Sequence, residues 1–294
     1  MKKIIVVFCF FSFALQLSAQ VKKVKHVVLI GCDGFGAYAL PDAKMPNLKK
    51  IMEEGSWSLK ARCVMPSSSA DNWASMLMGA GITEHGYTEW NSKVPEIPSV
   101  TTTKYGIFPT IFSVIRDQRP SAKTAVIYSW QGIAPLIEKD AIDIVIPGGK
   151  AGDEFCADTA AAVIKKEKPF FTFIHLSQPD GAGHEIGHRT AAYYDTLQKV
   201  DVRIGKIVQA VKEAGIADET IIIVTADHGG INKGHGGKSL DEIQIPWIIN
   251  GAGIKKDHEI KDVIITYDTA ATIAWIFGLK TPQSWRGKAV MDCF

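Results

Sequence analysis

The sequence has few cysteines, almost no net charge and only one long hydrophobic run. Five of its 294 residues are cysteine, and their spacing contains neither a CxxC pair nor a zinc-knuckle pattern, so thiolate zinc binding has little support. The 33 lysine and arginine residues nearly balance the 31 aspartate and glutamate residues, which argues against a nucleic-acid-binding patch and against an anionic-membrane binder. The sequence also lacks internal repeats, low-complexity tracts and long linkers.

The one long apolar run lies at the N-terminus. Lys2 and Lys3 are followed by a mostly apolar stretch, residues 4–17, and by Ser18 and Ala19, which are the three parts of a secretory signal. The run is shorter than the roughly 20 apolar residues that a membrane-spanning helix needs. We therefore predict a signal peptide over residues 1–19, export to the periplasm or outside the cell, and no transmembrane segment after its removal. The alternative is a retained N-terminal anchor.

The remaining residues, 20–294, are predicted to form a single domain, because a chain of this length that is 46% hydrophobic can bury one large core. Short continuous apolar runs alternate with helical patterns, which is typical of an α/β sandwich with a mostly parallel central sheet. The predicted strands cover residues 27–31, 124–128, 141–146, 170–176, 220–225 and 245–249. The predicted helices cover residues 46–54, 71–78, 108–116, 155–166, 189–214 and 268–277.

Acidic side chains follow three of the predicted strands. Asp33 follows the first strand, Asp180 follows residues 170–176, and Asp227 follows residues 220–225. Because ligands of parallel sheets gather at the carboxyl ends of the strands, we expect these three side chains to meet in one crevice. Residues 87–105 and 128–154 mix proline and glycine with aromatics and are the best candidates for loops over that crevice.

Histidines accompany the second and third of these carboxylates. His184 lies four residues after Asp180, and His228 and His235 follow Asp227. Zinc and manganese accept carboxylate oxygen and imidazole nitrogen, so a set without thiolates suits two divalent ions, Zn²⁺ first and Mn²⁺ second. A single aspartate after a strand is more often a helix cap or a turn residue, so the metal hypothesis depends on the whole set.

Four short segments, residues 27–34, 66–73, 179–184 and 224–237, carry these side chains, and the second reads P-S-S-S-A-D-N-W. Their order and residue types resemble the alkaline phosphatase superfamily, and within it the type I phosphodiesterase/nucleotide pyrophosphatase branch. The resemblance extends from about residue 25 to about residue 290. It implies a three-layer α/β/α fold and metal-dependent hydrolysis of a small-molecule phosphoric ester through a phosphoseryl-type covalent intermediate.

The resemblance also implies the roles of individual residues. The family nucleophile lies three residues after a proline and three before an asparagine, a spacing that Pro66, Ser69 and Asn72 keep. It therefore favours Ser69 over Ser67 and Ser68, with Asn72 and the N–H of residue 70 binding a non-bridging phosphate oxygen. One metal would be held by Asp33, Asp227, His228 and the oxygen of Ser69, and the other by Asp180, His184 and His235.

Five further histidines fall outside this assignment, and one of them, His85, resembles a superfamily His-Gly that supports the site without being a ligand. His188 lies four residues after His184 and could compete as a ligand, but Gly187 disfavours a regular helix between them, so His188 is expected to support the site at most. The ordinary assignment for His26, His175 and His258 is a strand edge or the surface.

The chain departs from the nucleotide-cleaving enzymes beside the nucleophile. Ala70 stands where they carry a base-stacking aromatic, and Trp73 replaces a histidine, so nucleotide preference stays open. Trp73, Trp90 or Trp130 could supply an apolar wall instead. A sulfatase is disfavoured, because none of the three adjacent serines has proline two residues on and arginine four residues on.

Two alternatives remain at this stage. Phosphomonoester hydrolysis would be helped by a cation for the extra phosphate charge, and the basic residues nearest in sequence to the ligands are Arg189, Lys233 and Lys238. A protein of another class, a non-catalytic binding protein on a degenerate phosphatase scaffold, would have lost a metal ligand. No ligand is missing from the sequence.

Overall fold

A single eight-stranded sheet runs through residues 24–294, the part of the chain that the computed structural model describes. The predicted signal peptide, residues 1–19, lies outside the described residues. The strand order is β4-β3-β5-β1-β6-β7-β2-β8. The strands are β1 (His26–Cys32), β2 (Gly55–Arg62), β3 (Thr124–Tyr128), β4 (Ile144–Pro147), β5 (Phe171–Leu176), β6 (Thr220–Thr225), β7 (Gln244–Gly251) and β8 (His258–Glu259).

The centre of the sheet is parallel. β1 pairs in parallel with β5 on one side and β6 on the other, and β3 and β4 extend the parallel part beyond β5. β7 runs antiparallel to β6 and to β2. Residues 27–32 of β1 are all buried, as a strand covered by helices on both faces must be. The predicted α/β fold with a mostly parallel sheet is confirmed.

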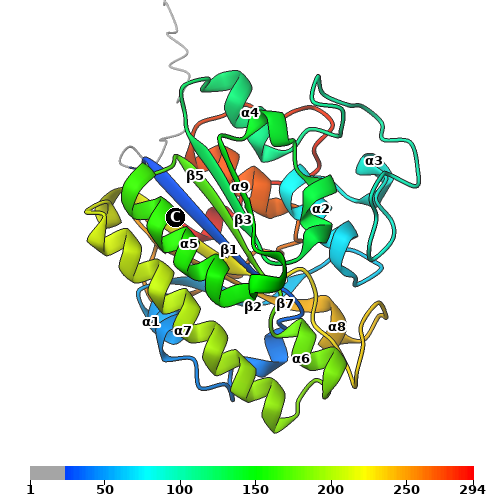
Figure 1. Cartoon of the computed structure of the whole chain (residues 1–294), viewed down its shortest axis with the longest axis vertical. Coiled ribbons are helices and arrows are strands. Elements are labelled where there is room, and N and C mark those ends of the chain that lie inside the picture. The colour runs from blue at the N-terminus through cyan, green and yellow to red at the C-terminus, as the bar shows by residue number, and fades with distance from the viewer. Residues whose placement is uncertain (1–23) are drawn as a thin grey trace, which may run out of the picture.

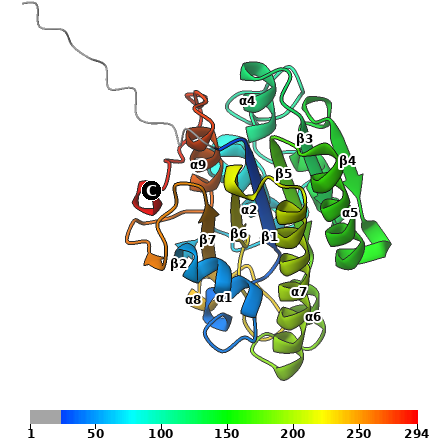
Figure 2. The ribbon, with the colours of Figure 1, turned by 90° about the vertical axis from the view of Figure 1, so that its left-hand side faces the viewer.

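Helices cover both faces of this sheet. α1, α5 and α7 pack on one face, and α2, α4 and α9 on the other (Figure 1, Figure 2). The helices are α1 (Pro46–Glu53), α2 (Ser69–Met78), α3 (Ile82–His85), α4 (Ile111–Gln118), α5 (Gly152–Glu167), α6 (Asp180–Glu185), α7 (Ala191–Glu213), α8 (Leu240–Ile243) and α9 (Asp268–Ile276). Within residues 24–294, none of them combines the length and the apolar character that crossing a bilayer requires.

The main differences from the predicted elements have local causes. The strand predicted over residues 141–146 begins at Ile144, because a 3-10 turn occupies Lys139–Ala141. β2 was not predicted, because its apolar side chains Trp57, Leu59 and Ala61 alternate with Ser58 and Lys60 and form no continuous run.

The contact between α1 and α7 depends on one buried carboxylate. Met45, the N-cap residue of α1, makes no side-chain cap. Asp201 of α7, which is 1% exposed, supplies it instead and accepts hydrogen bonds from Asn47 N at 3.1 Å, Asn47 Nδ2 at 2.8 Å and Leu48 N at 2.8 Å. Carboxylates are favoured at this position, because the first amide groups of a helix have no partner within the helix.

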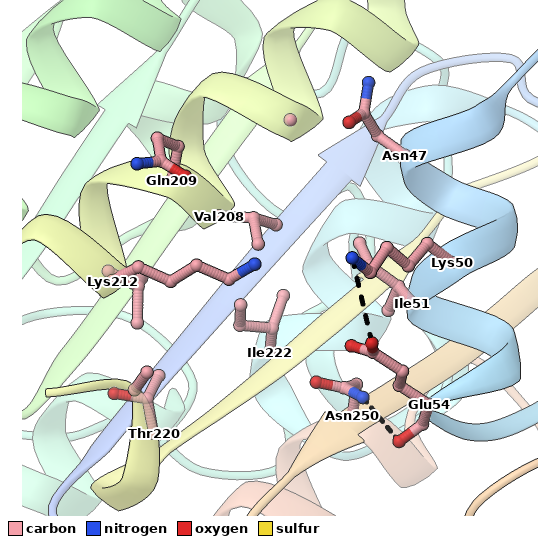
Figure 3. A pocket seen from close by; sticks show the side chains of 13 residues that line it. Asn47, Lys50, Ile51, Glu54, Val208, Gln209, Lys212, Thr220, Ile222 and Asn250 are labelled. Atoms are coloured by element: carbon pink, nitrogen blue, oxygen red, sulfur yellow. Dashed lines mark hydrogen bonds and ion pairs between the residues drawn. The ribbon is translucent and has the colours of Figure 1, made fainter.

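A cavity of about 180 Å³ remains between the same two helices (Figure 3). Ile222 of β6 forms part of its lining, and Lys50 at its edge pairs with Glu54 at 3.9 Å. Thr220, the first residue of β6, also lines it. The cavity therefore lies toward the amino end of β6, whereas Asp227 follows the carboxyl end.

We predict that Asp201→Ala lowers the free energy of unfolding by about 2 kcal/mol, because it removes a helix cap and leaves buried amide donors without an acceptor. Denaturant unfolding at a fixed metal concentration measures the change. Asp195→Ala on the exposed part of the same helix is the matched control and should change stability by less than about 0.5 kcal/mol. Equal stability of the two variants would contradict the capping role of Asp201.

Candidate active site

The predicted ligands come together at the carboxyl ends of three adjacent strands. Asp33 directly follows β1, Asp180 begins α6 after β5, and Asp227 lies two residues beyond β6. Because β5, β1 and β6 are neighbours in the sheet, their exits open on the same crevice. The main chain joins two of them, since Asp180 N donates to Asp33 O at 2.9 Å.

The first ligand group surrounds the Nε2 atom of His228. Asp227 Oδ2 lies 3.3 Å from this nitrogen, Asp33 Oδ1 lies 3.6 Å from it, and Ser69 Oγ lies 3.1 Å from it. All four side chains are buried. Ser69 is the first residue of α2, so its hydroxyl is presented at the positive end of that helix.

The second ligand group is more open to solvent. His184 Nε2 lies 3.4 Å from Asp180 Oδ2 and 3.1 Å from His235 Nε2, while His235 Nε2 lies 3.8 Å from Asp180 Oδ1. The side chain of His184 is 49% exposed and that of His235 is 9% exposed. Asp180 also lies close to Asp33 and His228, so it stands between the two groups.

Hydrogen bonds to the main chain fix the tautomer of each ligand histidine. Nδ1 of His184 donates to Lys233 O at 3.0 Å, Nδ1 of His228 donates to Gly229 O at 2.7 Å, and Nδ1 of His235 donates to Ser67 O at 3.0 Å. A carbonyl oxygen can only accept, so each Nδ1 carries the proton and each Nε2 presents a lone pair to the crevice. Metal-bound histidines are held in this way.

The acidic side chains of the site need a positive partner. Asp33 Oδ1, Asp180 Oδ1 and Asp227 Oδ2 are buried and have no hydrogen-bond partner among the described residues. Burial and the charge of Asp33 raise the pKa of Asp180 to about 8. Burial, together with the charges of Asp33 and Asp180, raises the pKa of Asp227 well above its usual range. Divalent cations would compensate these carboxylates, and the mixed oxygen and nitrogen donors fit such ions.

His228 and His235 are held neutral. Burial, aided by His235, lowers the pKa of His228 to about 3, and burial also lowers the pKa of His235. At Asp33 burial acts to raise the pKa, but the hydrogen bond from His175 and the nearby imidazoles outweigh burial and lower it. Neutral imidazole and ionised carboxylate are the forms that bind metal ions.

Asp33 is oriented by two side chains to which the sequence analysis gave no such role. Its Oδ2 accepts hydrogen bonds from His175 Nε2 at 3.1 Å and Trp73 Nε1 at 3.3 Å. The placement of His175 at a strand edge or on the surface is wrong, because it lies fully buried on the central strand β5, opposite Gly31 of β1. Its Nε2 donates, so His175 has the opposite tautomer from the ligand histidines and positions Asp33 rather than binding metal.

The three adjacent serines have different surroundings. Ser69 Oγ faces His228, whereas Ser68 Oγ donates to Asp71. Ser67 Oγ donates to Gly237 O at 2.7 Å, and its carbonyl oxygen holds His235. Ser67 therefore anchors the loop that carries His235, and Ser69 is the serine whose hydroxyl faces the first ligand group.

The role predicted for Asn72 needs correction. Its Oδ1 accepts from Val64 N at 2.7 Å, and its Nδ2 donates to Ser68 O at 2.9 Å and to Pro66 O at 3.0 Å. The amide is fully committed to the main chain around the nucleophile, so it has no donor left for a phosphate oxygen. Asn72 is a positioning residue. The N–H of residue 70 is likewise engaged, with Trp90 O at 3.1 Å.

His188 lies behind the site, as expected from the interruption at Gly187. α6 ends at Glu185, and Gly187 has φ of 121°. Nδ1 of His188 lies 3.0 Å from Tyr38 Oη, and its ring fills the space between the main chains of residues 183 and 230. It thus packs between the segments that carry His184 and His228.

A cavity of about 570 Å³ opens beside the second ligand group. His184 and His235 line it together with Pro66, Ser68 and residues 88–90. Part of the first predicted loop therefore borders the site. The second predicted loop, residues 128–154, is not a loop throughout, because it contains β4 and several 3-10 turns.

The fold and the convergent ligand groups define a member of the alkaline phosphatase superfamily. The sequence profile of the type I phosphodiesterase / nucleotide pyrophosphatase family matches residues 27–233, and the chain belongs to this family. His235 lies just beyond the matched segment.

Several known proteins are similar to this chain. The rat ectonucleotide pyrophosphatase/phosphodiesterase family member 7 is 24% identical over 228 residues, which are 71% of this chain and 51% of that protein. A venom phosphodiesterase from Macrovipera lebetinus is 24% identical over 217 residues, 69% of this chain and 25% of the venom protein. The chain thus spans about half or less of the length of these curated relatives.

Solved structures share the fold at low sequence identity. Human ectonucleotide pyrophosphatase / phosphodiesterase 5 superposes with a TM-score of 0.75 at 14% identity, covering 91% of this chain and 99% of that one. A phosphonate monoester hydrolase from Silicibacter pomeroyi has a TM-score of 0.70 at 16% identity, covering 90% of this chain and 75% of that one. At these sequence identities, the comparison shows that the structures share a fold.

We predict that His175→Leu weakens binding of one of two metal ions by about 10- to 100-fold, because Asp33 loses the donor that orients it. His175→Gln, which keeps an N–H donor, should recover most of the affinity. Competition with a chelating dye measures both affinities and the stoichiometry. His258→Leu, a change of the same type far from the site, is the control, and unchanged affinity in His175→Leu would contradict the positioning role.

Proposed function

We propose that this protein hydrolyses phosphodiesters with two divalent metal ions and Ser69 as the nucleophile. The observation that carries the proposal is the arrangement around Ser69 Oγ: lone pairs of tautomer-fixed histidines and unpartnered carboxylate oxygens face the same crevice. Membership in the type I phosphodiesterase/nucleotide pyrophosphatase family supports the same activity. A degenerate binding scaffold is disfavoured, because every predicted ligand is present and directed inward.

Asp33, Asp227, His228 and Ser69 would hold one ion, and Asp180, His184 and His235 the other. Zn²⁺ is proposed first and Mn²⁺ second, because the donors are carboxylate and imidazole without thiolate. When bound, such ions act as Lewis acids, lowering the pKa of a coordinated hydroxyl and offsetting the charge on phosphate oxygens.

The protein side chains position the reacting groups and exclude water from them. Ser69 Oγ attacks phosphorus, the bond to the leaving oxygen breaks, and a diester between phosphate and Ser69 results. Water then cleaves that diester and restores the hydroxyl. The start of α2 faces the phosphate with its positive end, while Trp73 and His175 keep the free oxygen of Asp33 directed into the site.

Diesters are favoured over monoesters by the positions of the nearby cations. The guanidinium of Arg189 pairs with Asp241 at 2.7 Å and 2.9 Å and lies 4.1 Å above the ring of Tyr38. Lys233 Nζ donates to Glu185 O at 2.9 Å. Two of the three nearby cations, Arg189 and Lys233, therefore have partners outside the crevice and are not set to meet the second negative charge of a terminal phosphate.

Export is a separate proposal, which the charged start, the apolar run and the small residues of the N-terminal segment support. The N-terminal sequence of the protein recovered outside the cytoplasm tests it, with cleavage expected near Ala19. An intact N-terminus on the exported protein would favour the retained anchor.

We predict that exhaustive chelation abolishes ester hydrolysis and that Zn²⁺, or Mn²⁺ less well, restores it. The purified protein should hold two ions per chain by elemental analysis. Asp227→Ala and His235→Ala should each lower this occupancy, whereas His188→Ala should leave it near two, because His188 is not among the ligands. Full activity after chelation and dialysis would refute the metal-dependent mechanism.

We predict that Ser69→Ala loses roughly a thousand-fold or more in turnover of an aryl phosphodiester while it keeps at least one metal ion, because the attacking oxygen is absent. Ser68→Ala should lose far less, since its hydroxyl is directed at Asp71. Steady-state rates at saturating metal and mass analysis for an adduct on the peptide of residues 66–73 provide the measurements. Near-normal turnover of Ser69→Ala would exclude Ser69 as the nucleophile.

A further inference from the structure

One exposed indole lines the cavity beside the second ligand group. Trp90 is 59% exposed, whereas Trp73 is fully buried under Gly31 and Trp130 packs toward His175. Of the tryptophans that could form an apolar wall, Trp90 is the one at this cavity. An indole with most of its surface in water, next to a catalytic crevice, is available to bind a ligand.

The main chain holds Trp90 at a fixed position relative to the nucleophile. Its carbonyl oxygen accepts from the N–H of Ala70, the residue that follows Ser69. The surrounding loop is fastened by Glu96, whose Oε2 accepts from Thr88 N at 2.8 Å and from Ser92 Oγ at 2.8 Å. The indole is therefore carried by an ordered loop that is tied directly to the start of α2.

The cavity has space for a flat group. Gly234 and Gly236 also line it, and a Cβ atom added at either would meet nothing within 4 Å. At about 570 Å³ the cavity is large enough for an aromatic ring with its substituents. Ring stacking on Trp90 is the contact that such a group would gain.

The charge of the lining disfavours anionic groups. Glu89 contributes to it, and neither lysine nor arginine is found among the described residues that line it. Lys233, the nearest cation in sequence, donates to Glu185 O. A polyphosphate chain entering here would meet a carboxylate and no compensating cation.

The cavity lies on the leaving-group side of the site. In an in-line displacement the leaving oxygen departs opposite the attacking one. Ser69 Oγ lies against His228 in the first group, whereas His184 and His235 of the second group line the cavity. A group that leaves past these two histidines enters the cavity.

We propose that this cavity receives the leaving group and selects flat, uncharged aromatic groups on Trp90, while Glu89 rejects polyphosphate leaving groups. The inference rests on the proposed phosphodiesterase activity and narrows it to diesters of aromatic alcohols, against nucleoside triphosphates. Trp90 and Glu89 are the residues that determine specificity.

The test measures binding and turnover separately. Binding of bis(4-nitrophenyl) phosphate to the zinc-loaded Ser69→Ala protein is followed by calorimetry, because this background does not consume the ligand. Adding Trp90→Ala should raise Kd about 5- to 10-fold, while Trp90→Phe should restore most of the affinity. Val94→Ala, a change at an exposed apolar residue of the same loop that does not line the cavity, is the matched control and should leave Kd unchanged.

Turnover is measured with proteins that keep Ser69, and it gives the substrate specificity. The protein should prefer bis(4-nitrophenyl) phosphate to ATP in kcat/KM, and Glu89→Gln should improve kcat/KM for ATP several-fold with little change for the aryl diester. An unchanged Kd in Trp90→Ala, or a preference for ATP, overturns the inference while ester hydrolysis stands. Absence of hydrolysis of every ester with either metal overturns the proposed function and the inference with it.

Discussion

Mutual repulsion among three closely spaced carboxylates is the constraint on which the rest of the site depends. Asp33, Asp180 and Asp227 face one another across the crevice. Asp33 and Asp227 are buried, the side chain of Asp180 is 17% exposed, and two of the three have raised pKa values because of burial and their neighbours. A folded chain does not hold such a cluster without compensation, since an uncompensated buried charge costs several kcal/mol. Neutral histidines whose lone pairs point inward offer no positive charge, so the compensation is left to cations.

Small residues allow the carboxylates to approach one another. Gly34 has φ of 68°, and a Cβ atom there would lie 2.6 Å from Cβ of Asp180. Its N–H donates to Asp227 Oδ1 at 3.1 Å, and its carbonyl accepts from Tyr193 Oη at 2.9 Å. One glycine thus joins the exits of β1, β5 and β6 and ties them to α7. A side chain at this position would force the two ligand groups apart.

The sequence was sufficient to bring the proposed ligands to one place in the fold but not to find the residues that position them. Asp33 and Asp227 were predictable because an apolar run ending in a carboxylate is a local pattern, and the order of the segments supplied the rest. His175 sits in an equally apolar run, and its function comes from facing Asp33 across the β5–β1 pairing, a register that no local pattern encodes. Asn72 shows the converse error. The family spacing indicated that its side chain binds phosphate, but hydrogen bonds to the main chain of residues 64–68 occupy its amide.

Trp73 links the packing of the core to the chemistry of the site. Its ring lies against Gly31 so closely that a Cβ there would come within 2.4 Å, and it contacts Phe173 and His175 of β5. The same ring donates to Asp33, so the helix that begins with Ser69 is tied to the proposed metal ligand that directly follows β1. A histidine at this position would fill less of the space between α2 and the sheet. The tryptophan therefore fixes nucleophile and ligand in one rigid unit, and it leaves recognition of the substrate to side chains farther along the chain.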